Sequence, residues 1–157
     1  AWGYIYKREF FVNNNFEFAK GLYHEDFGLI PLVLIKASKV ASTDVFGYNY
    51  VQTKTSITRG NEELRYRRAE DLLKHYDYML EKIKKYNVSK ITKQNIKIYY
   101  TNCIILELNN LNDEEQRRYI KQIRKRKMVN NIKARNLKQF IKKLILTCNI
   151  KLYLKLR

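Results

Sequence analysis

Three neighbouring side chains, His24, Glu25 and Asp26, are the first candidates for chemistry in this sequence. They stand between a small, turn-prone segment, 19–21, and the apolar run 27–35. A carboxylate held at the mouth of a pocket can take a proton from a substrate hydroxyl, which is the role of a general base. Acids at such a junction can also be plain helix-start residues, because negative charge is favourable beside free backbone N–H groups. The residues alone leave both interpretations open.

The elements around this acidic triplet are expected to mix extended and helical structure. Residues 1–12 alternate aromatic and polar side chains, which predicts a strand or extended loop running into a short element. The apolar run 27–37, with Pro31 near its start, predicts a buried helix. Residues 40–50 are typical of two short strands or a hairpin, and a polar loop follows over 52–60.

From residue 61 onward the sequence changes to helical periodicity. Apolar residues recur at helical spacing over 61–86 and 92–108, and a third helix is expected from Asn112, with acids in its first turn and bases in its last. One side of the second helix is expected to carry Ile96, Tyr99, Cys103, Ile104 and Leu108. Residues 131–146 are also helical in pattern, and the alternating residues after 149 leave the end of the chain open between helix and strand. We therefore expect a mainly α fold of the α+β class.

The composition limits the class of protein. The 157 residues are 45% hydrophobic, which suffices for a packed core and excludes wholesale disorder. Cys103 and Cys148 lie far apart and lack the paired spacing of a zinc site or a disulfide framework. No uncharged apolar run reaches the roughly 18 residues that a membrane span needs.

The net charge of +17 comes almost entirely from the end of the chain. Residues 1–60 carry 7 basic and 5 acidic side chains, and residues 61–115 carry 10 of each. Residues 116–157, here called the basic tail, carry 15 basic side chains and no acidic one. A basic surface over the entire fold is therefore not implied.

Four segments of residues 1–58 stand in a particular order. They are Ala1-Trp2 with Tyr6-Lys7-Arg8-Glu9-Phe10-Phe11, then Phe16, Phe18, Gly21 and His24-Glu25-Asp26, then 27–37 with Ala37-Ser38-Lys39-Val40, then Tyr48 and Tyr50 with Ser56-Ile57-Thr58. In this order and spacing they resemble the second half of a bacterial family 2 glycosyltransferase of the GT-A type. The resemblance implies a C-terminal part of a GT-A α/β domain over 1–60 and a helical C-terminal extension over 61–157.

The resemblance assigns roles to several side chains. Such enzymes transfer a sugar with inversion, and the position matching their general base is Asp26. Glu25 and His24 would orient the acceptor or the base. Trp2 would offer a flat face to a sugar ring, and the alternative for it is a core aromatic.

The sequence also departs from the family pattern. The arginines that usually stand before the Ser-Ile-Thr segment, where they can neutralise the departing diphosphate, are replaced by Val51 and Thr53. Lys54 or Arg59 would have to take over that role. The nucleotide-binding half of the fold, with its Asp-x-Asp metal ligands, has no counterpart in this sequence. We therefore expect a C-terminal portion of a longer enzyme, inactive alone, whose Mg²⁺ or Mn²⁺ is bound mostly by the other half and not by this chain.

The resemblance further implies the partners. They are a nucleotide-sugar donor and a saccharide or lipid-linked acceptor in bacterial surface polysaccharide or capsule synthesis, which places the protein in the cytoplasm or peripherally on the inner face of the cell membrane.

The basic tail admits three interpretations. Lys138, Lys142 and Lys143 alternate with apolar residues and would contact an anionic membrane surface, where each basic side chain contributes about 1 kcal/mol. A solvated face of a helical bundle is the plain alternative. Nucleic acid is less favoured, because the tyrosines follow helical core spacing and form no stacking platform. For the entire chain, the alternative to an enzyme is a basic helical binding module in which Glu25 and Asp26 merely cap a helix.

Overall fold

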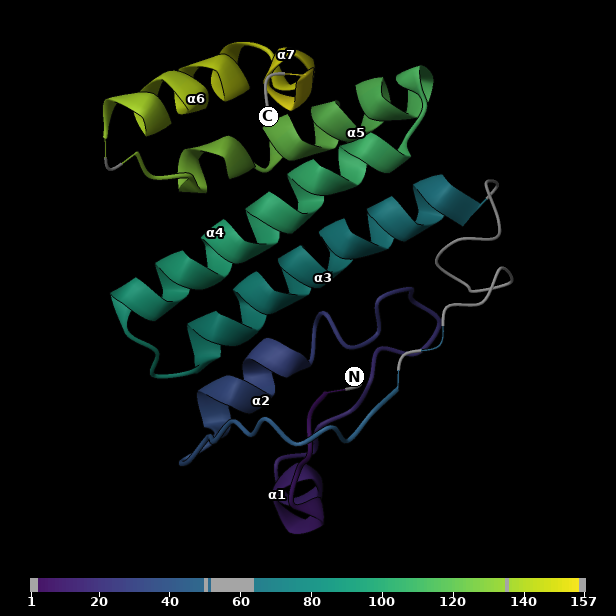
Figure 1. Ribbon diagram of the computed structural model, residues 1–157, viewed down its shortest axis with the longest axis vertical. Coiled ribbons are helices and arrows are strands. Elements are labelled where there is room, and N and C mark those ends of the chain that lie inside the picture. Colours follow the sequence, from purple (N-terminus) through teal and green to yellow (C-terminus); the bar gives the residue numbers. More distant parts are fainter. Residues whose placement is uncertain (1–2, 50, 52–63, 135, 156–157) are drawn as a thin grey trace. The chain divides into compact units, whose positions relative to one another are not determined.

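The computed structural model describes residues 3–49, 51, 64–134 and 136–155, and it contains no β-strand among these residues (Figure 1). The mainly α character expected from the sequence is thereby confirmed. Backbone contacts divide the chain into two compact units, Ala1–Asn87 and Val88–Arg157. No helix in the described part combines the length and apolar character needed to cross a lipid bilayer.

In the part of the first unit that the structure describes, the helices are α1 (Arg8–Asn13), α2 (Ile30–Lys36) and α3 (Arg65–Lys85). Helix α2 confirms the helix expected over the apolar run, and Pro31 stands in its first turn, where a missing N–H costs nothing. Leu32 and Val33 are buried. The ammonium group of Lys36 lies 4.7 Å from the centre of the Tyr86 ring, which follows α3 directly, so the ends of α2 and α3 are in contact.

The two short strands or hairpin expected over 40–50 are not found in the described residues, where 40–49 are irregular and exposed. A strand is stabilised by a neighbouring strand, and an isolated hairpin is marginal in water. Since the described residues offer no partner strand, the strand-like pattern is misleading here. Residues 1–12 were expected to form a strand or an extended loop running into a short element. The loop alternative holds for the described part, because residues 4–7 are irregular, with Lys7 extended, and run into the short helix α1.

The expected division at residue 60 differs from the division into compact units. Helix α3 belongs to the unit that begins at Ala1, so it folds with the residues before it. Asn61, the expected start of this helix, lies outside the described residues, and α3 is described from Arg65 onward. A functional boundary at residue 60 stays a prediction.

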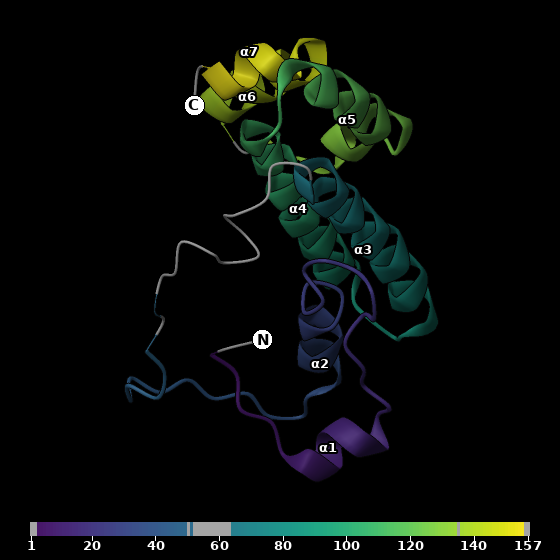
Figure 2. The same ribbon diagram turned by 90° about the vertical axis from the view of Figure 1, so that its right-hand side faces the viewer.

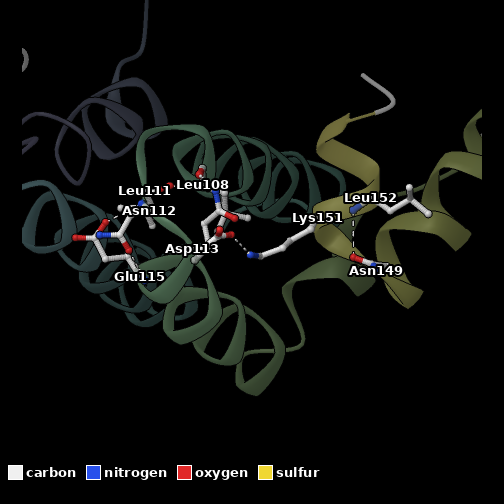
Figure 3. Close-up of polar contacts among 9 residues, drawn as sticks. Leu108, Leu111, Asn112, Asp113, Glu115, Asn149, Lys151 and Leu152 are labelled. Carbon is white, nitrogen blue, oxygen red and sulfur yellow. Dashed lines mark hydrogen bonds and ion pairs between the residues drawn. The ribbon is translucent and has the colours of Figure 1, made fainter.

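The second unit is built from short and long helices. They are α4 (Lys90–Glu107), η2 (Leu108–Asn110), α5 (Asp113–Lys125), η3 (Met128–Asn131), α6 (Leu137–Cys148) and α7 (Ile150–Lys155). The Ser89 hydroxyl accepts the Thr92 N–H at the start of α4. Asn112 and Glu115 form a reciprocal capping box at the start of α5 (Figure 3). These caps confirm the helices expected over 92–108 and from Asn112.

The end of the chain differs in part from expectation. The helix expected over 131–146 begins only at Leu137, because the Asn136 side chain caps it by accepting the Gln139 N–H. Of the residues after 149, left open between helix and strand, those described as regular structure form α7, which ends at Lys155. Lys151 of α7 pairs with Asp113 of α5, which ties the end of the chain to the second unit (Figure 3).

The buried face of α4 is shifted by one position from the expected one. Ile104 and Leu108 are buried as predicted, but Tyr100 is buried in place of Tyr99. A hydroxyl of the same face, Thr101, accepts a hydrogen bond from the Asn131 amide at 3.0 Å. This contact holds η3 against α4.

Candidate functional site

The His-Glu-Asp triplet lies in a series of turns between α1 and α2. We call residues 19–29 the acidic loop. Its own backbone folds it tightly: the Phe27 N–H donates to the His24 carbonyl at 2.8 Å, and the Leu29 N–H donates to the Asp26 carbonyl at 3.0 Å. His24 has a φ of +57°, in the left-handed region that few side chains adopt without a reason. The loop therefore has a defined local conformation.

Helix α3 binds the acidic loop through the backbone of one residue, Tyr23. The Tyr23 N–H donates to Asp71 Oδ2 at 2.9 Å, and His75 Nε2 lies 2.9 Å from the Tyr23 carbonyl oxygen. A carbonyl oxygen can only accept, so the Nε2 atom of His75 carries the proton. Asp71 and His75 are four residues apart, which places them on one side of α3. We call these two hydrogen bonds the Tyr23 clamp.

Both clamp side chains are buried, with exposed fractions of 0% for Asp71 and 1% for His75. A buried carboxylate is costly unless it is paired and hydrogen-bonded. Asp71 Oδ1 is paired with the ammonium group of Lys74 at 2.7 Å, while Oδ2 accepts the Tyr23 N–H. Each carboxylate oxygen thus has a partner, and the clamp is satisfied at both ends.

A glycine allows the loop to approach the clamp closely. A Cβ atom on Gly28 would lie 2.7 Å from Nδ1 of His75, inside the distance that real contacts show. The ring of Phe27 meets His75 edge-on, with 6.2 Å between the ring centres. The loop backbone therefore rests directly on the imidazole.

An open cavity of about 620 Å³ adjoins the loop within the first unit. The acidic loop lines this cavity with Glu25 and Gly28, and α3 lines it with Lys74, His75 and Lys82. This volume is within the range of small-molecule sites. Glu25 thus faces a cavity that also carries positive charge.

Asp26 has a different environment from Glu25. Its charge acts on Tyr6 and on His24, and it is only partly buried. The Tyr6 hydroxyl and the Nε2 atom of His24 are both buried and have no hydrogen-bond partner among the described residues. Two unused polar groups therefore lie within electrostatic reach of the Asp26 carboxylate.

Burial shifts the proton affinities of both groups. It raises the pKa of Tyr6 above the ordinary tyrosine value, and the neighbouring Tyr4 and Asp26 add to this. Burial also lowers the pKa of His24, because the charged imidazolium is disfavoured away from water; the nearby His75 adds to the decrease and Asp26 opposes it. His24 is therefore held in its neutral form.

The structure brings some of the predicted site residues together and leaves others aside. His24, Glu25 and Asp26 share the acidic loop, as expected. Trp2, Lys54 and Arg59 lie outside the described residues. The predicted membrane residues, Lys138, Lys142 and Lys143, belong to α6 in the second unit. Among the described residues, no group of three or more His, Cys, Asp or Glu side chains is placed to hold a metal ion.

The sequence analysis did not single out the clamp. One local signal for it exists: Asp71 and His75 interrupt the apolar stripe of α3 that includes Leu72 and Tyr76. Two polar residues four apart on a buried face need hydrogen-bond partners. Here both bind Tyr23, which lies 48 residues before Asp71 and 52 residues before His75. Periodicity cannot locate so distant a partner.

One known protein is similar to this chain. It is from Escherichia coli (strain K12) and is named an uncharacterized glycosyltransferase, YibD; the two sequences are 31% identical over 98 residues. The match covers 58% of this chain and 27% of the relative, so the chain spans about a quarter of the length of the protein it matches. No protein-family model and no solved structure matches the chain.

The extent of this match places α3 within it. Since 58% of 157 residues is about 91 residues, any continuous stretch of that length includes positions 67–91. The similarity is therefore longer than the 58 residues that carry the family-like segments. It takes in Asp71 and His75 of the Tyr23 clamp.

Proposed function

We propose that the first unit is the acceptor-side part of an inverting family 2 glycosyltransferase, and that Asp26 is its general base. The observation that carries this proposal is the acidic loop itself, folded by its own turns and fixed by the Tyr23 clamp. The similarity to a protein named as a glycosyltransferase supports the class of reaction. A nucleotide-sugar would be the donor, and a glycan or lipid-linked acceptor of surface polysaccharide synthesis would receive the sugar.

The reaction needs one proton to move. The acceptor hydroxyl oxygen forms a bond to the anomeric carbon of the donor sugar while the bond from that carbon to the nucleotide diphosphate breaks on the opposite face. The hydroxyl proton passes to the Asp26 carboxylate, and the electron pair of the broken bond leaves with the diphosphate. Asp26 is only partly buried, so an acceptor can approach it.

The neighbours of Asp26 suit the binding of a hydroxyl-rich acceptor. Neutral His24 and Tyr6 each have a buried polar atom without a partner in the described chain, and sugar hydroxyls can both donate and accept, so an acceptor that exposed these atoms would satisfy them. Glu25 projects into the adjoining cavity, where it would bind a further hydroxyl of the same acceptor. These groups would orient the acceptor before the proton moves.

A divalent cation, Mg²⁺ or Mn²⁺, is part of the proposal for the complete enzyme. It would neutralise charge on the departing diphosphate. Following the family resemblance, the proposal assigns its ligands mainly to the nucleotide-binding half of the enzyme. The steps assigned to Asp26, His24 and Glu25 do not depend on where it binds.

The decisive variant is Asp26→Asn in the complete enzyme, assayed for sugar transfer. A general base contributes about 100- to 10,000-fold to a rate, and we expect kcat to fall by at least about 100-fold. Asp44→Asn is the matched control, because it makes the same change at an exposed carboxylate outside the loop. Equal activity of the Asp26 variant and the wild type, with an unchanged melting temperature, would remove Asp26 from the mechanism.

A further inference from the structure

Helix α6 presents an apolar stripe to solvent. Leu137, Phe140, Ile141 and Leu144 have exposed fractions between 48% and 73%. Their spacing of three, four and seven residues from Leu137 places them on one face of the helix. We call these four residues the α6 stripe.

The opposite face of α6 is turned toward the rest of the second unit. Leu146 is buried, and Gln139, Lys142 and Lys143 line a cavity of about 400 Å³ together with residues of α4. Figure 2 shows α6 lying together with α7, and both views place them side by side. A surface helix ordinarily turns its apolar face to the core and its charges to water, whereas α6 has most of its large apolar side chains outside. Such a face indicates a contact with something beyond this unit.

The charge around the stripe restricts what that contact is. Residues 116–157 carry 15 basic side chains and no acidic one. A second copy of the chain would bring the same positive charge to the contact, which is unfavourable. Nucleic acid would satisfy the charge but would leave the stripe in water. An anionic lipid surface satisfies both, because headgroups attract the basic side chains and the acyl boundary accepts the apolar ones.

We propose that α6 binds an anionic membrane surface, lying in its plane with the α6 stripe inserted between the lipids. The stripe, and not the lysines alone, determines the binding. Lys138 follows Leu137 and is exposed beside the stripe, so its ammonium group can reach the headgroups. Lys142 and Lys143 line the cavity on the other face and contribute mainly through the overall charge. This proposal does not depend on the glycosyltransferase assignment.

The first test measures co-sedimentation of the chain with vesicles. Wild type should bind vesicles of phosphatidylcholine and phosphatidylglycerol at a ratio of 7:3, and should bind pure phosphatidylcholine far less. Leu137→Gln combined with Phe140→Gln should weaken binding to the anionic vesicles by at least about tenfold, because two large apolar side chains no longer insert. Phe46→Gln is the matched control, since Phe46 is fully exposed but lies in the first unit, and it should bind as wild type does.

A second measurement reports insertion directly. Phe140→Trp in a Trp2→Phe background gives the chain a single tryptophan on the stripe. Its fluorescence should shift to shorter wavelength with the anionic vesicles, and should not shift with a DNA duplex at the same salt concentration. Because Phe140 is exposed, Phe140→Trp should keep the melting temperature of the Trp2→Phe parent.

Three outcomes would overturn the proposal. The first is unchanged binding of the Leu137→Gln, Phe140→Gln double variant to anionic vesicles, which would mean that charge alone holds the chain on the membrane. Another is tight binding to the DNA duplex with no binding to vesicles, which would assign the tail to nucleic acid. The third is a wild-type dimer that the stripe variant dissociates, again without vesicle binding, which would make the stripe a contact between two copies.

Discussion

Single buried polar atoms determine how the acidic loop is held. Asp71 and His75 bind the two sides of Tyr23, and no apolar contact could replace this pairing, because a backbone N–H and a carbonyl each need a partner when they leave water. The clamp gives the loop a fixed place relative to α3. A general base must lie within hydrogen-bond reach of its substrate, so under the proposed function this fixing would also position Asp26.

We expect even the addition of one methyl group at Gly28 to destabilise the first unit. Gly28→Ala places a methyl group 2.7 Å from His75 Nδ1, and His75 cannot move without breaking its bond to Tyr23. We expect the free energy of unfolding to fall by about 1–3 kcal/mol. Urea unfolding measures it. Gly47→Ala is the control: an added Cβ there meets no atom within 4 Å, and the variant should be neutral or slightly more stable. Equal stabilities of the two variants would contradict the close packing of the loop on His75.

His24 should make the first unit sensitive to mild acid. Its pKa is lowered in the folded chain, so above about pH 6.5, the ordinary histidine value, both folded and unfolded forms are neutral and the stabilisation is complete. As the pH falls from there through the lowered pKa, the unfolded form binds the proton first and stability is lost.

The corresponding measurement is the melting temperature at pH 7.5 and pH 5.5 for wild type and His24→Asn. Asparagine tolerates the left-handed backbone at this position but does not titrate in this range. The variant should lose less stability than wild type between the two pH values. An identical pH dependence would show that His24 is not buried as a neutral group.

Helices were the elements that the sequence specified best. Apolar periodicity in α4, and the charge polarity of α5 from Asn112 onward, are local signals, so both helices could be predicted close to their bounds. Strands were predicted wrongly because alternation describes one strand and says nothing about the neighbour it requires. Helix α6 was predicted, but its orientation was not, since periodicity gives two faces and does not say which one meets the core.

The capping box at the start of α5 should contribute measurably to stability. Asn112→Ala removes the acceptor of the Glu115 N–H and breaks the reciprocal pair. We expect a loss of about 0.5–2 kcal/mol in the free energy of unfolding. Thermal or urea unfolding followed by helical circular dichroism measures it. Asn109→Ala, the same change at an exposed asparagine of η2, should have a smaller effect; a loss as large there would argue against a specific cap.

At the scale of the entire chain, the composition showed where the positive charge is concentrated, but it did not show where the chain divides into two compact units. The concentration of basic residues in 116–157 can be found by counting. The structure adds that the basic residues of α6 share this helix with exposed apolar side chains. The family-like segments end near residue 58, and the helical C-terminal extension predicted over 61–157 stays a prediction. Contacts across about 50 residues join α3 to the acidic loop, and such contacts leave no trace in local patterns.

The Tyr23 clamp has a practical consequence for anyone who wishes to shorten this protein. A gene truncated after residue 60 would retain every motif that invites its classification, including the complete His-Glu-Asp triplet. It would nevertheless remove the donor and the acceptor that secure the Tyr23 peptide groups, together with one wall of the cavity that Glu25 faces. A suitable cloning boundary therefore falls after Asn87, where the first compact unit ends, and not near residue 58, where the family-like segments end.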